Sequence, residues 1–208
     1  KLRRALLSTS RPDNNNYSYS LGRMLAFKYL EKENIKLELI DESQNIYRLG
    51  KMTIKQFKKN DGGYVNADDG GYQILLNFRK TSSKSAFKTV SMTDVLEKKI
   101  PSDLMKDKIV LIGYITPSVK DYFYTPYSID DQTKFNGVEI HAQLTSQIIS
   151  GALDGRPSIK TIADPLEWFW VLIVSGCSAT FGALFVRNKM LSLSGIILTA
   201  SGVLIISG

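Results

Sequence analysis

Residues 168–186 read WFWVLIVSGCSATFGALFV, a run of nineteen residues without a charged side chain. At about 1.5 Å of rise per residue, a helix of this length spans roughly 28 Å, close to the bilayer hydrocarbon core of about 30 Å. Asp164, Pro165 and Glu167 precede the run, a combination typical of a helix N-terminus. The sequence therefore predicts a transmembrane helix over residues 164–186.

A second uncharged stretch covers residues 190–208, and Arg187-Asn188-Lys189 separates the two. We expect a short turn over residues 187–189 and a second transmembrane helix, cut short by the end of the sequence. Positive charge is retained on the cytoplasmic side of a membrane, so the turn is predicted to be cytoplasmic. Residues 1–163 would then be extracytoplasmic in a multi-pass protein of the cell membrane, although Lys160 on the other flank argues weakly against it.

The net charge of +7 does not indicate a nucleic-acid partner, because acidic and basic residues are mixed along the chain. Glu31-Lys32-Glu33 and Glu97-Lys98-Lys99 are examples, and they are typical of a solvated surface. Cys177, the only cysteine, lies inside the first apolar run, so neither an internal disulfide nor a cysteine metal cluster is expected. We expect no metal and no cofactor.

The fold class follows from residues 108–113, KIVLIG, an unbroken apolar run ended by glycine and typical of a strand buried on both faces. A long loop comes next, and then a helix over residues 138–149 with Gly151 expected just beyond its end. Strand, loop and helix in this order indicate an α/β domain. We predict a central, largely parallel sheet with flanking helices, followed by a transmembrane helical hairpin.

Shorter patterns predict the remaining elements. A helix capped by Ser18 or Ser20 should bury a stripe made by Leu21, Met24, Leu25 and Tyr29. Strands are expected over residues 35–39, 72–78 and 87–90, a hairpin over residues 46–57 around Gly50-Lys51, and a capping box at Ser91 and Asp94.

Polar groups gather at two places where an α/β fold puts a site. The loop after the predicted buried strand carries Lys120, Asp121, Tyr124 and Thr125, and the next helix starts with Glu139 and His141. We expect the loop and the helix start to approach each other, with these six residues binding a ligand or signalling. No nucleophile–base pair is visible, so no catalytic residue is predicted. The same groups could instead satisfy one another as structural contacts, and the sequence leaves that open.

Several segments, in chain order, resemble the CHASE domain of type 2: KIVLIG (108–113), KDYFYTPYS (120–128), FNGVEIHAQLTSQIISG (135–151) and EWFWVLIVSG (167–176). This is an extracellular sensory domain found with bacterial cyclases and kinases, and the resemblance covers roughly residues 17–186. It implies an N-terminal part of the domain that is missing here, about three membrane helices, and a cytoplasmic cyclase or kinase effector.

The expected function is the sensory input module of a bacterial transmembrane receptor, which binds a stimulus and transmits it without doing chemistry. Two alternatives stay open: a membrane-anchored hydrolase using Asp121, Glu139 and His141, and an ectodomain that only binds partner proteins. The expected partners are a small-molecule or protein stimulus of unknown identity and membrane lipid. A homodimer is left open.

Overall fold

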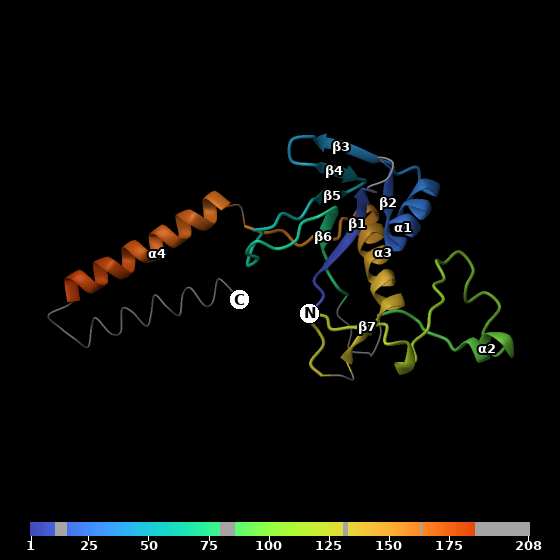
Figure 1. Ribbon diagram of the computed structural model, residues 1–208. Coiled ribbons are helices and arrows are strands. Elements are labelled where there is room, and N and C mark those ends of the chain that lie inside the picture. The colour runs from blue at the N-terminus through green and yellow to red at the C-terminus, as the bar shows by residue number, and fades with distance from the viewer. Residues whose placement is uncertain (11–15, 80–85, 131–132, 163, 186–208) are drawn as a thin grey trace. The chain divides into compact units, whose positions relative to one another are not determined.

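The structure, a computed structural model, forms two compact units, residues 1–159 and residues 160–208 (Figure 1). The predicted turn at 187–189 and the second membrane helix at 190–208 lie outside the described residues. The described residues are 1–10, 16–79, 86–130, 133–162 and 164–185.

The first sheet of residues 1–159 is antiparallel and has three strands in the order β2 (Tyr17–Tyr19), β1 (Arg4–Ser10) and β6 (Tyr72–Leu75). A register shift between Leu6 and Ser8 leaves Leu7 buried in the core. Pairing continues one step past β6, because the Leu76 N–H donates to the Arg3 carbonyl at 2.8 Å. β1 therefore has a neighbour on each of its two edges.

The second sheet is an antiparallel meander of β3 (Leu37–Asp41), β4 (Ile46–Leu49) and β5 (Met52–Lys55). The predicted hairpin is confirmed, and Gly50 makes its turn with a φ of 57°, a backbone conformation that glycine adopts without strain. Along β5 the side chains of Met52 and Ile54 are buried while their neighbours are exposed. This sheet therefore has one face on the core.

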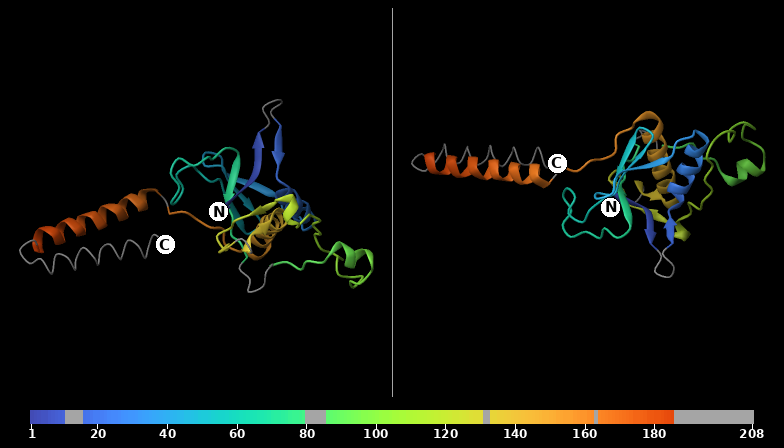
Figure 2. Two further views of the ribbon diagram at one scale, coloured as in Figure 1. Left: turned by 60° about the horizontal axis from the view of Figure 1, so that its bottom comes forward. Right: turned by 90° about the horizontal axis from the view of Figure 1, so that it is seen from above.

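Helices α1 (Leu21–Lys32) and α3 (Gly137–Asp154) lie side by side (Figure 2). Ser20 caps α1, as the sequence predicts, and accepts a hydrogen bond from the Arg23 N–H. The predicted apolar stripe is wrong in part. Leu21 and Met24 are exposed, and Tyr29 packs partly buried against the core. The fully buried residues of α1 are Gly22, Ala26 and Leu30. Small side chains let α1 approach α3 closely: a Cβ on Gly22 would lie 2.9 Å from Leu144.

The predicted end of α3 is also wrong. Gly151 lies inside the helix and is buried against the Met52 side chain, where a Cβ would come within 2.5 Å of the sulfur. The helix ends at Gly155, which is left-handed with a φ of 71°. Leu144 and Ile148 are buried, as expected. The core consists of Leu7, Ala26, Leu30, Leu49, Met52, Ile54, Ile74, Leu76, Phe78, Leu144, Ile148 and Ala152.

The strand predicted over residues 108–113 is wrong: this segment is irregular, and Val110 and Ile112 are 48% and 85% exposed. Among the described residues every pairing is antiparallel, so the predicted central parallel sheet is not found there. An apolar run becomes a strand only if a neighbour takes its N–H and C=O groups. No described strand pairs with residues 108–113. Residues 87–90, also predicted as a strand, are irregular too.

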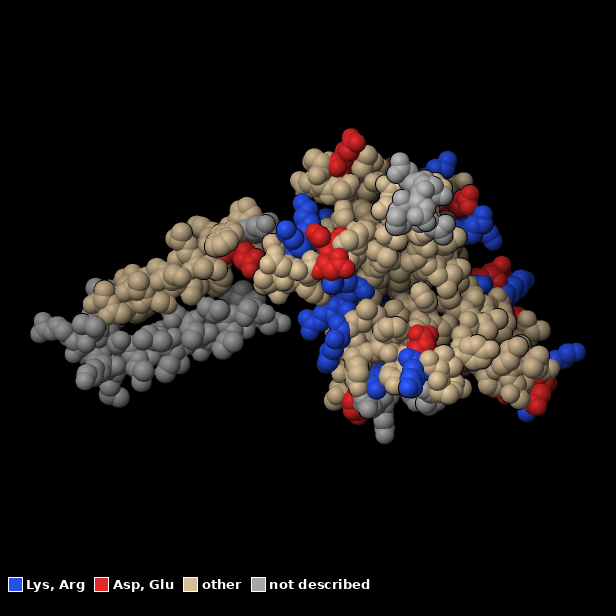
Figure 3. All heavy atoms as spheres, viewed as in Figure 1, with Lys and Arg blue, Asp and Glu red and all other residues tan. Residues whose placement is uncertain are grey.

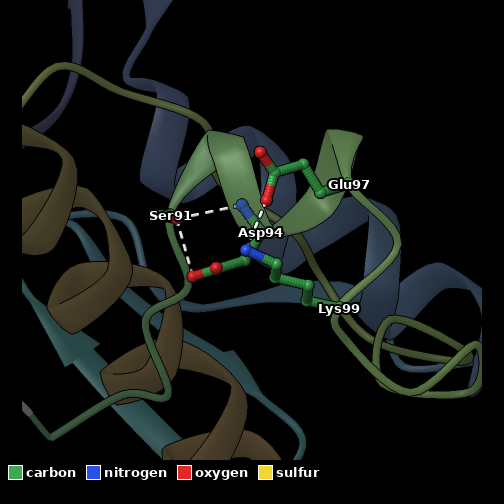
Figure 4. Close-up of polar contacts among 4 residues, drawn as sticks. All are labelled: Ser91, Asp94, Glu97 and Lys99. Atoms are coloured by element: carbon green, nitrogen blue, oxygen red, sulfur yellow. Dashed lines mark hydrogen bonds and ion pairs between the residues drawn. The ribbon is translucent and has the colours of Figure 1, made fainter.

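The predicted capping box at α2 (Met92–Leu96) is confirmed (Figure 4). The Ser91 hydroxyl donates to the Asp94 carboxylate at 2.7 Å and accepts from the Asp94 N–H at 3.0 Å. Lys99 and Glu97, just beyond the helix, form an ion pair at 2.5 Å on the surface. Local sequence alone determines this short helix.

In residues 160–208, the described helix is α4 (Asp164–Phe185), which begins where the sequence predicts. Its segment Pro165–Ala183 is long and apolar enough to cross a membrane by length and composition, and none of it is buried within the structure. The Thr180 hydroxyl donates to the Gly176 carbonyl of the same helix at 2.8 Å. This bond satisfies the hydroxyl donor without water. A helical hairpin is not shown by the described residues.

Charged side chains of both signs share the visible face of the structure in small groups (Figure 3). Lys28 and Glu31, for example, pair at 3.0 Å on an exposed part of α1. The picture agrees with the solvated surface that the sequence indicates.

Candidate functional site

A two-residue ladder brings the predicted loop to the start of α3. β7 (Tyr122–Phe123) pairs antiparallel with β8 (Phe135–Asn136), and α3 follows β8 directly. The Gly137 N–H, at the first residue of α3, donates to the Asp121 carbonyl at 3.0 Å. The predicted approach of loop and helix start is thus confirmed. The cause of this approach differs from the one expected. The sequence predicts that a buried parallel strand positions the loop, whereas in the described residues the β7–β8 ladder does so.

Gly137 allows the Asp121 carboxylate to lie against the first turn of α3. A Cβ on Gly137 would overlap both carboxylate oxygens of Asp121, so a larger residue would displace them. The N-cap residue Asn136 makes no capping hydrogen bond with its side chain. A carboxylate near a helix N-terminus is favoured by the helix dipole, typically by about 0.3–1 kcal/mol.

Glu139 and His141, in the first turns of α3, are both half-buried. One oxygen of Glu139, Oε1, is enclosed and has no hydrogen-bond partner in the described part of the chain. His141 follows Gly137 by four residues, about 6 Å along the helix axis. Its carbonyl accepts from the Thr145 hydroxyl at 2.8 Å, whereas its imidazole makes no hydrogen bond or ion pair with the residues described. Both side chains keep hydrogen-bonding capacity for another group.

Tyr124 takes part in an aromatic contact that the sequence does not reveal. The Lys134 Nζ lies 4.3 Å from the Tyr122 ring centroid and 4.6 Å from that of Tyr124. Continuing the ladder register past Phe123 and Phe135 places Lys134 opposite Tyr124. Only the register would have indicated Lys134, because nothing in the local sequence marks it. The ammonium group over two rings gives the ladder a positive and aromatic surface.

Thr125 and Lys120 have different surroundings. Thr125 is fully buried, and its N–H donates to the Ser128 hydroxyl at 2.9 Å while its carbonyl accepts from the Ser128 N–H at 3.0 Å. It therefore closes a turn behind the tyrosines. Lys120 is exposed and has a φ of 54°, an uncommon conformation for a residue with a side chain. The structure thus places Asp121 against the first residue of α3, the helix whose first turns carry Glu139 and His141, and Lys120 precedes Asp121 in the chain.

These groups provide acceptors, an imidazole and cations, which suit recognition of a polar ligand. Among the residues that the structure describes, no three His, Cys, Asp or Glu side chains are arranged to hold a metal ion.

The family model of the CHASE2 domain matches residues 1–180. This chain belongs to the CHASE2 family. CHASE2 is an extracellular sensory domain of membrane proteins, and it is not catalytic. The match includes β1 and begins earlier than residue 17, where the sequence resemblance was expected to start. No curated protein and no solved structure matches the chain.

In this CHASE2 domain, two glutamines hold α3 to the segment after β6. The sequence did not indicate either of them as a functional or structural contact. Gln147 accepts from the Asn77 N–H at 2.8 Å and donates to the Leu75 carbonyl at 3.0 Å. Gln143 accepts from the Arg79 N–H at 2.9 Å. Their side chains replace a neighbouring strand along this edge. Two glutamines four residues apart, and so on one side of the helix, are the signal that could have identified them.

The chain leaving α3 is fastened to the same segment. Arg156 Nη2 donates to the carbonyls of Asn77 at 2.8 Å and Phe78 at 3.2 Å, and the Asn77 side chain donates to the Pro157 carbonyl at 2.9 Å. α3 therefore has the candidate site at its first turn and a hydrogen-bonded anchor just past its end.

Proposed function

We propose that this chain is the extracytoplasmic sensory input module of a bacterial transmembrane receptor. The observation that carries the proposal is the CHASE2 match over residues 1–180, which includes most of the apolar helix α4. The receptor would be a multi-pass protein of the cell membrane, with a second span over residues 190–208. Its effector would be a cytoplasmic cyclase or kinase.

The stimulus would bind at the start of α3, where Asp121, Glu139 and His141 lie and Lys120, Tyr124 and Thr125 form the adjoining loop. A stimulus can shift a receptor only if it binds two conformations with different affinity. Glu139 Oε1 is enclosed without a partner among the described residues. A donor on the stimulus would satisfy this oxygen, so the stimulus would bind more tightly to the conformation that encloses it. α3 would carry the change to the anchor at Arg156 and on toward α4.

The chain contains one histidine and one cysteine, and these supply two natural reporters. His141 lies at the candidate site, and Cys177 lies in α4 and is exposed. We suggest reconstituting the chain in lipid nanodiscs, with a spin label on Cys177 and isotope-labelled histidine. A panel of amino acids, organic acids, sugars and peptides would then be titrated.

A stimulus should shift the His141 NMR signal and change the spin-label mobility at Cys177 with the same dissociation constant. Asp121→Asn and Glu139→Gln should weaken both responses together. Asp94→Asn, a control in α2, should alter neither response. A ligand that shifts His141 but leaves Cys177 unchanged would contradict transmission. Turnover of an ester or peptide, lost in Asp121→Asn, would instead favour a membrane-anchored hydrolase.

A partner-binding ectodomain is the second candidate, because one stretch of the surface favours it. Exposed apolar side chains lie close in sequence along one irregular segment: Val110, Ile112, Tyr114 and Ile115. Exposed apolar residues that lie together often mark a surface for another protein. If this is the function, Ile112→Ser should abolish association with the partner while the two reporters respond to no small molecule.

A further inference from the structure

Arg79 and Arg156 meet alongside α3. Arg79 bonds to Gln143 and Ser146 in the middle of the helix, and Arg156 follows two residues after its end. The Arg156 guanidinium lies 3.2 Å from the carbonyl of Phe78, the residue just before Arg79. The Arg79 Nε donates to the Ser146 hydroxyl at 2.6 Å, which directs this side chain along α3. Both arginines are half-buried. Backbone and hydroxyl groups thus hold both side chains in place, close enough for the Arg79 charge to act on Arg156.

No negative charge offsets them within the part of the chain that the structure describes. The ion pairs found there, Lys28–Glu31 and Lys99–Glu97, involve neither arginine. Burial first, and then the neighbouring Arg79 cation, lower the pKa of Arg156, while Tyr127 acts in the opposite direction. Two like charges brought together at a partly buried place repel each other, and an anion between them would relieve this repulsion.

Hydrogen-bond donors at the same place are also unsatisfied. Arg156 Nη1 and Gln143 Nε2 are enclosed and have no acceptor among the described residues, and the Ser158 hydroxyl nearby in the chain is in the same condition. Gln143 is only 1% exposed. A buried donor without a partner is destabilising, and an acceptor on a bound group would satisfy it. Tyr127, whose ring packs edge-on against Phe78 at 6.5 Å between centroids, adds a hydroxyl on this side.

We propose that Arg79 and Arg156 form a binding site for an oxyanion, a phosphate or carboxylate group carried by a small molecule or by a lipid headgroup. A planar guanidinium binds such groups with two parallel hydrogen bonds, and Arg156 has Nη1 left for this purpose. Arg156 precedes α4 by eight positions in the chain, and its Nη2 holds the segment after β6. An anion at this place would therefore strengthen or weaken the anchor through which the chain leaves the domain.

The test uses the whole chain in phosphatidylcholine nanodiscs and follows the Nε–H signals of the arginines by NMR. In one arm inorganic phosphate is added, and in the other phosphatidylglycerol replaces part of the lipid. Saturable shifts of Arg79 and Arg156 with phosphate identify a soluble oxyanion as the source. The same shifts with phosphatidylglycerol alone identify the lipid headgroup.

Arg79→Gln should weaken binding by about tenfold or more, because it removes one charge-assisted partner of the anion. Arg48→Gln, which removes an exposed charge from β4, should leave it unchanged. Arg156→Gln also removes the bonds to Asn77 and Phe78, so the folding of this variant must be checked by circular dichroism. If Arg156→Gln is unfolded, the test rests on Arg79→Gln. Shifts in neither arm, or undiminished binding by folded Arg79→Gln, would overturn the proposal.

Discussion

Tyr72 links the two sheets of residues 1–159 through one hydroxyl group. Its O–H lies 2.7 Å from the Asn45 carbonyl and 3.1 Å from the Ile54 carbonyl, and its ring packs edge-on against Tyr47. Burial, and after it the neighbouring Tyr47, raise the pKa of Tyr72, whereas Arg23 acts to lower it. The neutral phenol is therefore the form that the fold requires.

Tyr72→Phe should lower the free energy of unfolding by about 1–2 kcal/mol, because two carbonyls lose their donor. Denaturant unfolding measures this change, and Tyr17→Phe, at an exposed ring, should stay within about 0.5 kcal/mol of the parent. The pH dependence has a definite sign. A raised pKa in the folded state means that stability is intact below the unfolded pKa of about 10 and falls as the pH rises above it. Tyr72→Phe should show a smaller fall over that range.

Elements are held together here by close backbone contacts as much as by side chains. The hairpin of β4 and β5 meets α3 at Gly50, where a Cβ would lie 2.5 Å from the Ala152 carbonyl, and the Lys51 N–H donates to that same carbonyl at 2.9 Å. Gly50→Ala should therefore destabilise the domain by about 2–4 kcal/mol, combining a strained positive φ with overpacking. Gly63→Ala, with nothing within 4 Å, is the matched control. Equal unfolding midpoints for the two variants would contradict this contact.

The glutamine contacts between α3 and the segment after β6 make a second prediction at this scale. Gln147→Ala leaves the Asn77 N–H and the Leu75 carbonyl without partners, so we expect a loss of about 2–4 kcal/mol. Gln44→Ala, on an exposed turn, should change the free energy of unfolding by less than about 0.5 kcal/mol. Native-state hydrogen exchange gives a direct reading, since the Asn77 amide should lose its protection in Gln147→Ala alone. A protected Asn77 amide in that variant would count against the contact.

Elements set by local chemistry could be predicted from the sequence, and elements set by distant neighbours could not. The cap at Ser20, the turn at Gly50 and the capping box at Ser91 each depend on residues a few positions apart. The segment 108–113 has the composition of a strand, but no described strand pairs with it. Gly151 resembles a helix stop in the sequence, yet its role is to pack against Met52.

At the scale of the whole molecule, α4 is the candidate membrane span, by its length and its apolar composition. Leu172 is exposed near the middle of the apolar segment. Leu172→Arg should impair membrane insertion, because an arginine at the centre of a span costs about 2.5–3.5 kcal/mol on insertion scales. Alkaline extraction should release this variant from membranes, whereas Ile112→Arg, an equally apolar and exposed position of the sensory domain, should remain bound. Release of both variants, or of neither, would argue against α4 as the membrane span.

Only part of the candidate site could be predicted from the sequence, again because local chemistry is visible there and distant contacts are not. Asp121, Glu139 and His141 could be named because their types and their place at a helix start indicate polar recognition. The glutamine contacts of α3 and the pair of Arg79 and Arg156 could not, because residues more than sixty positions apart meet only in the fold. Nothing in the sequence around either arginine marks it.

We propose that the CHASE2 domain lies outside the cytoplasm and is joined to a membrane-spanning α4. Cys177 is the only cysteine, so Cys177→Ser combined with Ser102→Cys leaves one thiol on an exposed turn of the domain. A membrane-impermeant maleimide added to intact spheroplasts tests the claim directly. We expect the thiol at position 102 to be labelled without permeabilisation. Labelling that occurs only after the membrane is opened would place the domain in the cytoplasm and contradict it.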